Sequence, residues 1–412
     1  MDTVRQENIF TRNFTQFLGS GIFSTLGDAI YLIALAWYIT KLHGSGTLMG
    51  SVLLTIGITR IFFILVGGVV ADRWRPKQLM VLSCMLRALL VGTLGLIVFY
   101  TTAPAWFLLT VAFLFGMIDA FYYPAGGVIR QMVCKGRLVQ RNSINFTSAQ
   151  LMNILGPAIG GYLLTVSSFA IGFWITVALF LLAGIMISQV QEKEEDPKET
   201  KEETASFISQ FKEGLRFIRG EKWLFILLVS LFFINMGVNG AMMTIPFLVV
   251  ELGLGAESYG LINASFSIGA FLAGIFFLVR SLKTLSFFTL YLSFFFQGFF
   301  LIPIFWLTDF WWIAASFLLV GIFTGIIGVL LPSFTQSGIP KEYMGRAGSV
   351  ANMIAMGSTP IAQFVFGVLT DSLGPRVLFL LGGCLETLAA VIAYLYLRLS
   401  VSNTKIQYRE AS

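Results

Sequence analysis

Twelve separate apolar stretches, each long enough to cross a lipid bilayer, constrain this chain more than any other feature. A spanning helix needs roughly 20 apolar residues, and only helices or closed barrels satisfy their backbone hydrogen bonds inside a membrane. With 57% hydrophobic residues, a water-soluble core could not hide all the apolar surface. We therefore predict an all-α membrane protein with twelve transmembrane helices. Their limits are about 14–40, 47–70, 78–100, 105–129, 144–167, 170–190, 223–250, 258–280, 284–306, 310–333, 347–369 and 376–397.

The basic residues predict how these spans are oriented. The first span follows a polar stretch that lacks a small-residue cleavage site, so we expect it to be retained. Nearly all of the 27 Lys and Arg residues fall on one side of the predicted membrane. Lys41 and Arg376 lie on the other side, and Arg60 and Arg87 lie inside spans. Since basic loops stay in the cytoplasm, we predict a multi-pass protein of a bacterial inner or plasma membrane with both termini cytoplasmic.

A run of charged residues at 191–203 divides the spans into six and six. We therefore predict an N-terminal six-helix bundle at 1–190, a charged cytoplasmic linker at 191–222, a C-terminal six-helix bundle at 223–398 and a cytoplasmic tail at 399–412. Within the linker, apolar and basic residues follow helical spacing on different faces, which predicts an amphipathic helix on the cytoplasmic membrane surface. The apolar residues are Phe207, Phe211, Leu215 and Ile218, and the basic ones are Lys212, Arg216 and Arg219.

The two halves also resemble each other. An apolar span containing Gly and then Pro leads into a basic loop and a small-residue span, at 116–124 in the first half and at 325–332 in the second. A duplicated six-helix unit is typical of transporters built from parallel repeats.

The loop after the second span, Gly-Val-Val-Ala-Asp-Arg-Trp-Arg-Pro-Lys, resembles the cytoplasmic loop signature of the major facilitator superfamily, although Arg75 and Pro76 stand where the family has Gly and Arg. We expect Gly68 to allow a close helix approach and Asp72 to accept hydrogen bonds at a neighbouring helix end. The loop would then latch one conformation of the transport cycle; the alternative is a merely basic turn. The expected latch residues are Gly68, Asp72, Arg73 and Lys77.

The fifth span carries Leu-Gly-Pro-Ala-Ile-Gly-Gly-Tyr at 155–162, which resembles the Gly-Pro motif of the exporter branch of that superfamily. Pro157 removes a backbone donor and bends the helix, while Gly156, Gly160 and Gly161 permit tight packing. We predict a hinge that favours antiport; ordinary small-residue packing is the alternative. With the segments at 26–35, 124–125 and 367–374, the chain looks like the subgroup of macrolide-type drug efflux proteins and siderophore exporters.

Five ionisable residues lie deep in the predicted spans, where a charge is expensive and usually functional. The resemblance implies that spans 1, 4, 7 and 10 line a central cavity, so Asp28 and Asp119 are our candidates for proton coupling and substrate binding. The alternatives are that Asp28 caps a broken helix or that an acid pairs permanently with an Arg; Arg87 is a possible partner of Asp119. The secondary charged candidates are Arg60, Arg87 and Glu386.

Uncharged polar and adaptable side chains on the expected cavity-lining spans suit a large, mostly apolar ligand. For the Asn and Met residues, helix-to-helix packing is an equally good interpretation, and the Tyr residues could equally face lipid. The predicted lining residues are Tyr31, Tyr122, Tyr123, Asn235, Asn239 and Met243.

The sequence contains no phosphate-binding Gly loop with Lys-Ser/Thr, no HExxH and no Cys cluster, which disfavours ATP-driven transport and metal-dependent hydrolysis. We expect no enzyme activity, metal or cofactor, with a proton gradient as the energy source. The net charge of +6 is explained by basic loops and needs no nucleic acid. The expected partners are a small-molecule substrate and membrane lipids, for a monomer.

The resemblance and the buried acids together predict a proton antiporter of the major facilitator fold, in which two six-helix bundles rock about a midplane site and export amphipathic drugs such as macrolides. Export of a siderophore or another metabolite, or flipping of a lipid or lysophospholipid, are alternative functions. A membrane-embedded enzyme or a non-transporting scaffold is a more distant alternative.

Overall fold

The computed structural model describes residues 9–134, 137–191, 207–279 and 286–400. Every regular element in these ranges is a helix, and twelve helical segments are long and apolar enough to cross a membrane. The prediction of an all-α membrane protein with twelve spans is confirmed. The predicted tail beyond Ser400 and most of the charged linker lie outside the described residues.

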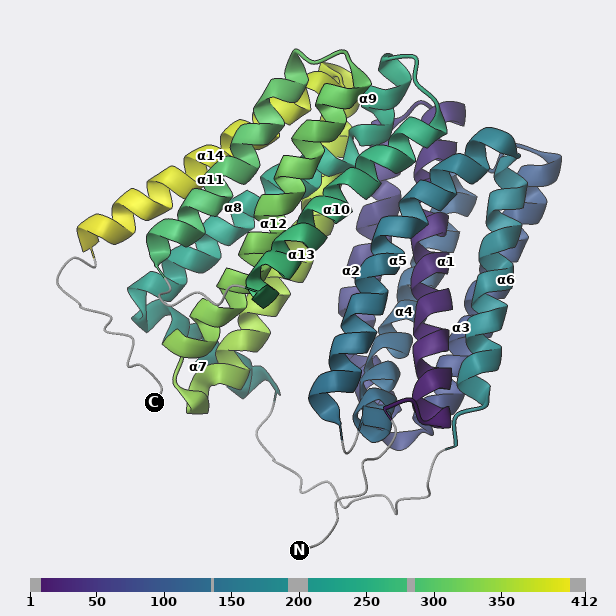
Figure 1. The fold of residues 1–412 in the computed structure, drawn as a ribbon, viewed down its shortest axis with the longest axis horizontal. Helices are drawn as coiled ribbons and strands as arrows, with labels where there is room; N and C mark the ends of the chain where they lie inside the picture. Colours follow the sequence, from purple (N-terminus) through teal and green to yellow (C-terminus); the bar gives the residue numbers. More distant parts are fainter. Residues whose placement is uncertain (1–8, 135–136, 192–206, 280–285, 401–412) are drawn as a thin grey trace, which may run out of the picture. The chain divides into compact units, whose positions relative to one another are not determined.

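The chain divides into two compact units, Met1–Asp196 with Val249–Ala264, and Pro197–Leu248 with Ser265–Ser412. In the first unit, α1 packs on α5 and α6, α2 packs on α4, and α3 packs on α4 and α6. These helices are coloured purple to teal in Figure 1. Their bounds are α1 (Arg12–Leu42), α2 (Gly46–Arg73), α3 (Pro76–Tyr100), α4 (Ala105–Cys134), α5 (Leu138–Val166) and α6 (Phe169–Ser188).

The second unit repeats this pairing of helices. Within it, α8 packs on α13 and α14, and α11 packs on α12 and α14, as α1 packs on α5 and α6 and α3 on α4 and α6. The repeated set of neighbours agrees with the duplicated unit expected from the sequence. The helices after the linker are α7 (Phe207–Gly220), α8 (Lys222–Met243), α9 (Ile245–Glu251), α10 (Ala256–Val279), α11 (Phe287–Leu301), η1 (Ile302–Phe305), α12 (Phe310–Gly338), α13 (Lys341–Leu373) and α14 (Pro375–Ser400).

Polar residues mark where several of these helices begin. The Ser45 hydroxyl accepts a hydrogen bond from the Leu48 amide at 3.1 Å, and the Asp309 carboxylate accepts one from the Trp311 amide at 2.9 Å. Each bond satisfies an amide that the first turn of a helix leaves without a partner. The connections that carry these caps are short, so consecutive spans run antiparallel.

The division into units differs from the predicted halves at one segment. Val249–Ala264, the end of α9 and the beginning of α10, groups with the first unit. A Cβ on Gly161 of α5 would lie 2.8 Å from Gly260 Cα, and the Trp37 ring stacks on Tyr259 at 6.1 Å. The absence of a side chain at Gly161 is what allows this approach.

The amphipathic helix predicted in the linker is α7, but its apolar face is used differently. We expected that face to lie on the membrane surface. Phe217, which lies beside that face, stacks on Tyr343 of α13 with ring centroids 4.5 Å apart. Ile218 is buried in the hydrophobic core of the second unit, and Glu213 forms an ion pair with Arg346 at 2.7 Å. Packing on α13 removes this apolar surface from water just as lipid would.

Candidate functional site

A buried guanidinium lies at the centre of the first unit. Arg87 on α3 is completely buried, and its Nη2 donates to Asp119 Oδ1 on α4. Its Nη1 lies 3.6 Å from Asp28 Oδ1 and donates to Ser24 Oγ at 3.2 Å, both on α1. Three helices therefore converge on one cation with two carboxylates, which we call the Asp28–Arg87–Asp119 cluster.

Aromatic rings enclose the guanidinium on its remaining sides. Arg87 Cζ lies 4.3 Å from the centroid of Tyr122, 5.5 Å from Phe115 and 5.7 Å from Phe180. A desolvated cation gains about 2 kcal/mol from a well-placed aromatic face. The rings thus stabilise the charge and exclude water from it.

Helix packing brings α1 close enough for this arrangement. A Cβ on Gly27, the residue before Asp28, would lie 3.0 Å from Phe180 Cε1 on α6. A larger residue at this position would separate α1 from α6 and draw Asp28 away from Arg87.

A cavity of about 250 Å³ within the first unit leads to one carboxylate of the cluster. The Asp28 side chain is 23% exposed, compared with 7% for Asp119 and 0% for Arg87. Asp28 is therefore the member of the cluster that solvent reaches. The polar residues that line the cavity are Ser24, Thr25, Asp28, Tyr122, Tyr123, Arg130, Asn145 and Ser148.

A second cation lies near the cavity. The guanidinium carbon of Arg60, on α2, lies 5.9 Å from the ring centroid of Tyr123. Arg60 Nε is buried and has no hydrogen-bond partner among the described residues. The structure thus places three of the predicted charged candidates, Arg60, Arg87 and Asp119, in the same unit as Asp28.

Two predicted lining residues are buried in the bundles instead. Tyr31 is fully buried and stacks on Phe115 at 4.6 Å, so it supports the aromatic surroundings of Arg87 and is not among the residues that line this cavity. Met243 is buried as well. The Tyr31 side chain points towards α4, which the sequence could not indicate. Tyr122 and Tyr123 do line the cavity.

The polar residues of α8 remain accessible in the second unit. Asn235 and Asn239 are both half-buried, and Asn239 Nδ2 donates to the backbone oxygen of Asn235 at 3.1 Å. The same helix face therefore carries two amides with spare hydrogen-bonding capacity.

Glu386 on α14 is completely buried in the second unit. Neither of its carboxyl oxygens has a hydrogen-bond partner among the described residues, and the neighbouring Thr387 Oγ1 has none either. Glu386 is therefore separate from the Asp28–Arg87–Asp119 cluster and makes no ion pair with a described residue.

The glycines of α5 pack against the helix that carries Asp28. A Cβ on Gly156 would clash with the side chain of Ala29, and one on Gly160 would lie 3.3 Å from Ile33 Cγ2. Pro157 lies inside α5 between these glycines. The predicted hinge motif therefore forms the contact between α5 and α1, one residue away from Asp28.

The predicted latch motif differs from its prediction in the residue that allows the close helix approach. Outside its own helix turn, no atom of a described residue lies within 4 Å of a Cβ built on Gly68, whereas one on Gly67 would clash with the backbone of Ala120 on α4. The close helix approach expected at Gly68 thus occurs one residue earlier, because a step of one residue turns a helix by about 100°. Lys77 is half-buried in the first turn of α3, and the side chains of Asp72 and Arg73 lie outside the described residues.

Ser24, Phe115 and Phe180 also contact Arg87 but were not predicted from the sequence. Ser24 precedes Asp28 by four residues, so the two side chains share a helix face, and this spacing was the available signal. The two Phe residues carried none in a chain with 41 of them. Across the part of the chain that the structure describes, no group of three His, Cys, Asp or Glu residues is placed to hold a metal.

The structure has twelve candidate spans, the same pairs of neighbouring helices in both units, and a buried ion cluster beside a cavity. These features are typical of a polytopic transporter. The chain belongs to the Major Facilitator Superfamily, whose sequence profile matches residues 17–362. It is 23% identical to the MFS-type transporter YvqJ of Bacillus subtilis, with 100% of this chain and 99% of the relative covered.

Two relatives carry functional names. Macrolide efflux protein A of Streptococcus pyogenes is 25% identical, with 92% of this chain and 94% of the relative covered. The multidrug efflux pump Tap of Mycolicibacterium fortuitum is 23% identical, with 90% and 93% covered.

A solved structure shows the same fold. The inward-facing bacterial homologue of the iron transporter ferroportin has a TM-score of 0.71 at 14% identity, covering 93% of this chain and 98% of that structure. The family and fold are those of transporters.

Proposed function

We propose that this protein is a proton-coupled exporter of amphipathic drugs that works by alternating access, with Asp28 as the residue that exchanges a proton for cargo. The observation that carries the proposal is the Asp28–Arg87–Asp119 cluster, in which one cation is shared by two carboxylates of unequal exposure.

The two carboxylates differ in how firmly Arg87 holds them. Asp119 accepts a direct hydrogen bond from Arg87 and is nearly buried, whereas Asp28 lies 3.6 Å away and faces the cavity. A buried guanidinium needs a counter-charge inside a membrane, and Asp119 provides it permanently. Asp28 is thereby left to bind either a proton or a cationic group entering from the cavity.

The rest of the cavity suits an amphipathic cargo. Tyr122 and Tyr123 present aromatic surface, and Ser24, Thr25 and Asn145 present hydrogen-bonding groups. Ligand sites combine these elements, and a cavity of about 250 Å³ would hold part of a large cargo molecule. The likeness to macrolide efflux protein A and to Tap supports a hydrophobic antibiotic as the cargo.

The glycine contacts of α5 support a conformational role for the predicted hinge. Because Gly156 and Gly160 lie against α1, bending of α5 at Pro157 would move α1 together with Asp28. Proton binding at Asp28 and movement of the helices are thereby linked in one unit.

We also propose that the protein is a monomer in the bacterial cell membrane, with both termini in the cytoplasm. The support for this orientation is the excess of Lys and Arg in the loops on one side of the twelve spans.

Proteoliposomes with an imposed pH gradient test this proposal. The wild-type protein should accumulate a radiolabelled macrolide and release protons in the same interval. Asp28→Asn should abolish gradient-driven transport while the protein still folds. Asp309→Asn is the matched control, because it makes the same chemical change at an exposed helix cap, where Asn caps as well as Asp. Full gradient-driven transport by Asp28→Asn would falsify the role of Asp28. A siderophore-secretion assay run in parallel distinguishes the competing cargo.

A further inference from the structure

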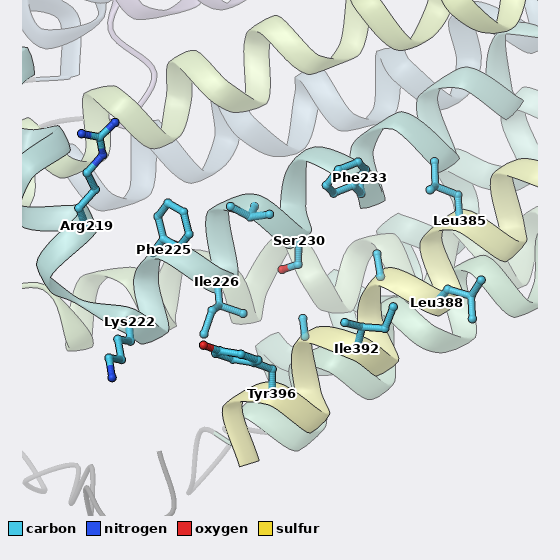
Figure 2. A pocket seen from close by; sticks show the side chains of 13 residues that line it. Arg219, Lys222, Phe225, Ile226, Ser230, Phe233, Leu385, Leu388, Ile392 and Tyr396 are labelled. Atoms are coloured by element: carbon cyan, nitrogen blue, oxygen red, sulfur yellow. The ribbon is translucent and has the colours of Figure 1, made fainter. Parts of the chain in front are cut away.

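A groove of about 590 Å³ runs between α8 and α14 inside the second unit. Figure 2 shows its apolar side chains, with Arg219 and Lys222 at one end and Phe233 and Leu385 at the other. The residues that line it are Arg219, Lys222, Phe225, Ile226, Val229, Ser230, Phe233, Leu385, Leu388, Ala389, Ile392, Ala393 and Tyr396.

The walls of the groove are hydrocarbon. Phe225 and Val229 on α8 and Leu388 and Ile392 on α14 are all exposed. Ser230 and Tyr396 carry the hydroxyl groups of the lining. The Ser230 hydroxyl is already used, since it lies 2.9 Å from the Leu227 carbonyl oxygen and 3.1 Å from the Tyr291 hydroxyl. Such a surface accommodates an alkyl chain, and because lipid tails are equally apolar, the charged end of the groove decides which lipid binds.

The two cations at the end of the groove are free to bind an anion. Arg219 lies in the last turn of α7 and Lys222 begins α8, and both side chains are exposed. Neither forms an ion pair with a described acid. Of the acids nearby in sequence, Glu213 is paired with Arg346, and Glu221 is half-buried and does not line the groove.

The length of the groove matches one leaflet of a bilayer. Eleven residue steps separate Lys222 from Phe233, and at 1.5 Å each they span about 16 Å. Half of a hydrocarbon core of about 30 Å is about 15 Å. With the two cations at the headgroup level, the apolar part of the groove reaches the bilayer centre.

We propose that this groove binds one anionic phospholipid, with an acyl chain between α8 and α14 and its phosphate on Arg219 and Lys222. With the basic loops facing inwards, the lipid comes from the cytoplasmic leaflet. The one-leaflet length favours a phospholipid as the occupant, and the two cations at the groove end favour an anionic headgroup over a zwitterionic one. The bound lipid connects α7, which packs on α13, to α8 and α14.

Native mass spectrometry of the full-length protein with added phosphatidylglycerol or phosphatidylcholine of identical acyl chains tests the site. Each cation near an anionic lipid headgroup contributes about 1 kcal/mol. We therefore expect phosphatidylglycerol to bind about 30-fold more tightly, which corresponds to about 2 kcal/mol. The double variant Arg219→Ala with Lys222→Ala should bind the two lipids equally.

The control is the double variant Arg216→Ala with Arg398→Ala, which removes two exposed cations that do not line the groove. It should still bind phosphatidylglycerol more tightly than phosphatidylcholine. Val229→Trp fills the groove from an exposed position and should weaken binding of both lipids. Equal binding of both lipids by the wild-type protein would overturn the proposal. The proposal would also be overturned if the variant without Arg219 and Lys222 still preferred phosphatidylglycerol. It would equally be overturned if the control variant lost that preference.

Discussion

Replacing Asp119 by Asn tests whether the two acids of the Asp28–Arg87–Asp119 cluster have different roles, with Asp119 as the permanent partner of Arg87 and Asp28 as the proton-exchanging carboxylate. The variant removes the carboxylate that accepts the direct hydrogen bond from Arg87 and leaves the guanidinium buried. Breaking a buried ion pair by removing one partner costs about 3–5 kcal/mol. Because Asp28 remains 3.6 Å from Arg87, we expect the lower end of that range, about 3 kcal/mol.

Asp28→Asn should behave differently in the same measurement. Asp28 makes no hydrogen bond with Arg87, and its side chain is 23% exposed. Its removal therefore loses only a partly solvated electrostatic contact, and we expect about 1 kcal/mol. Asp119→Asn should thus destabilise the fold strongly, whereas Asp28→Asn should mainly block coupling.

Equilibrium unfolding in mixed micelles of mild detergent and SDS, with wild-type protein as reference, measures both free energies. The double variant Arg87→Met with Asp119→Leu supplies an independent test. It removes the pair and leaves apolar groups, so it should be more stable than Asp119→Asn alone. Our reasoning is refuted if Asp119→Asn unfolds like wild type, or if Asp28→Asn loses more stability than Asp119→Asn.

Three further predictions follow from single contacts. Glu386→Gln should leave the thermal unfolding midpoint unchanged, because Glu386 has no cation or hydrogen-bond donor among the described residues; a large drop would reveal an ion pair. Tyr122→Ala should lower the free energy of unfolding by about 3–5 kcal/mol more than Tyr122→Phe, since only Phe keeps the buried ring volume and an aromatic face 4.3 Å from Arg87 Cζ; equal losses would count against a cation–π contact. Gly161→Val should lower the midpoint by several degrees by forcing α5 from Gly260, whereas Gly68→Ala should not, and the opposite order would contradict the helix contacts described above.

The twelve spans and their approximate ends could be predicted because each depends on local composition. An apolar stretch of about 20 residues has few alternatives to a membrane helix. The division differed at Val249–Ala264, which groups with the first unit through packing of Gly161 on Gly260. That contact joins residues almost a hundred positions apart, and neither residue signals the other in the sequence.

The charged residues of the candidate site could be predicted from the sequence, but their contacts could not. Asp28, Arg87 and Asp119 stood out because a charge inside a membrane is expensive, so their importance was visible in the sequence. That both acids share Arg87, and that only Asp28 faces a cavity, was not visible. Tyr31 and Tyr122 looked equivalent, yet one stacks on Phe115 and the other lines the cavity.

The sequence by itself determined that this chain forms twelve membrane helices, because hydrophobic length and the need to satisfy backbone hydrogen bonds leave no other fold. It also determined the superfamily, through motifs such as the one at 155–162. Only the tertiary structure decided which face of each helix meets a neighbour. A rotation of about 100° per residue separates Gly67, which contacts α4, from Gly68, which meets no other helix among the described residues, and hydropathy is the same at both.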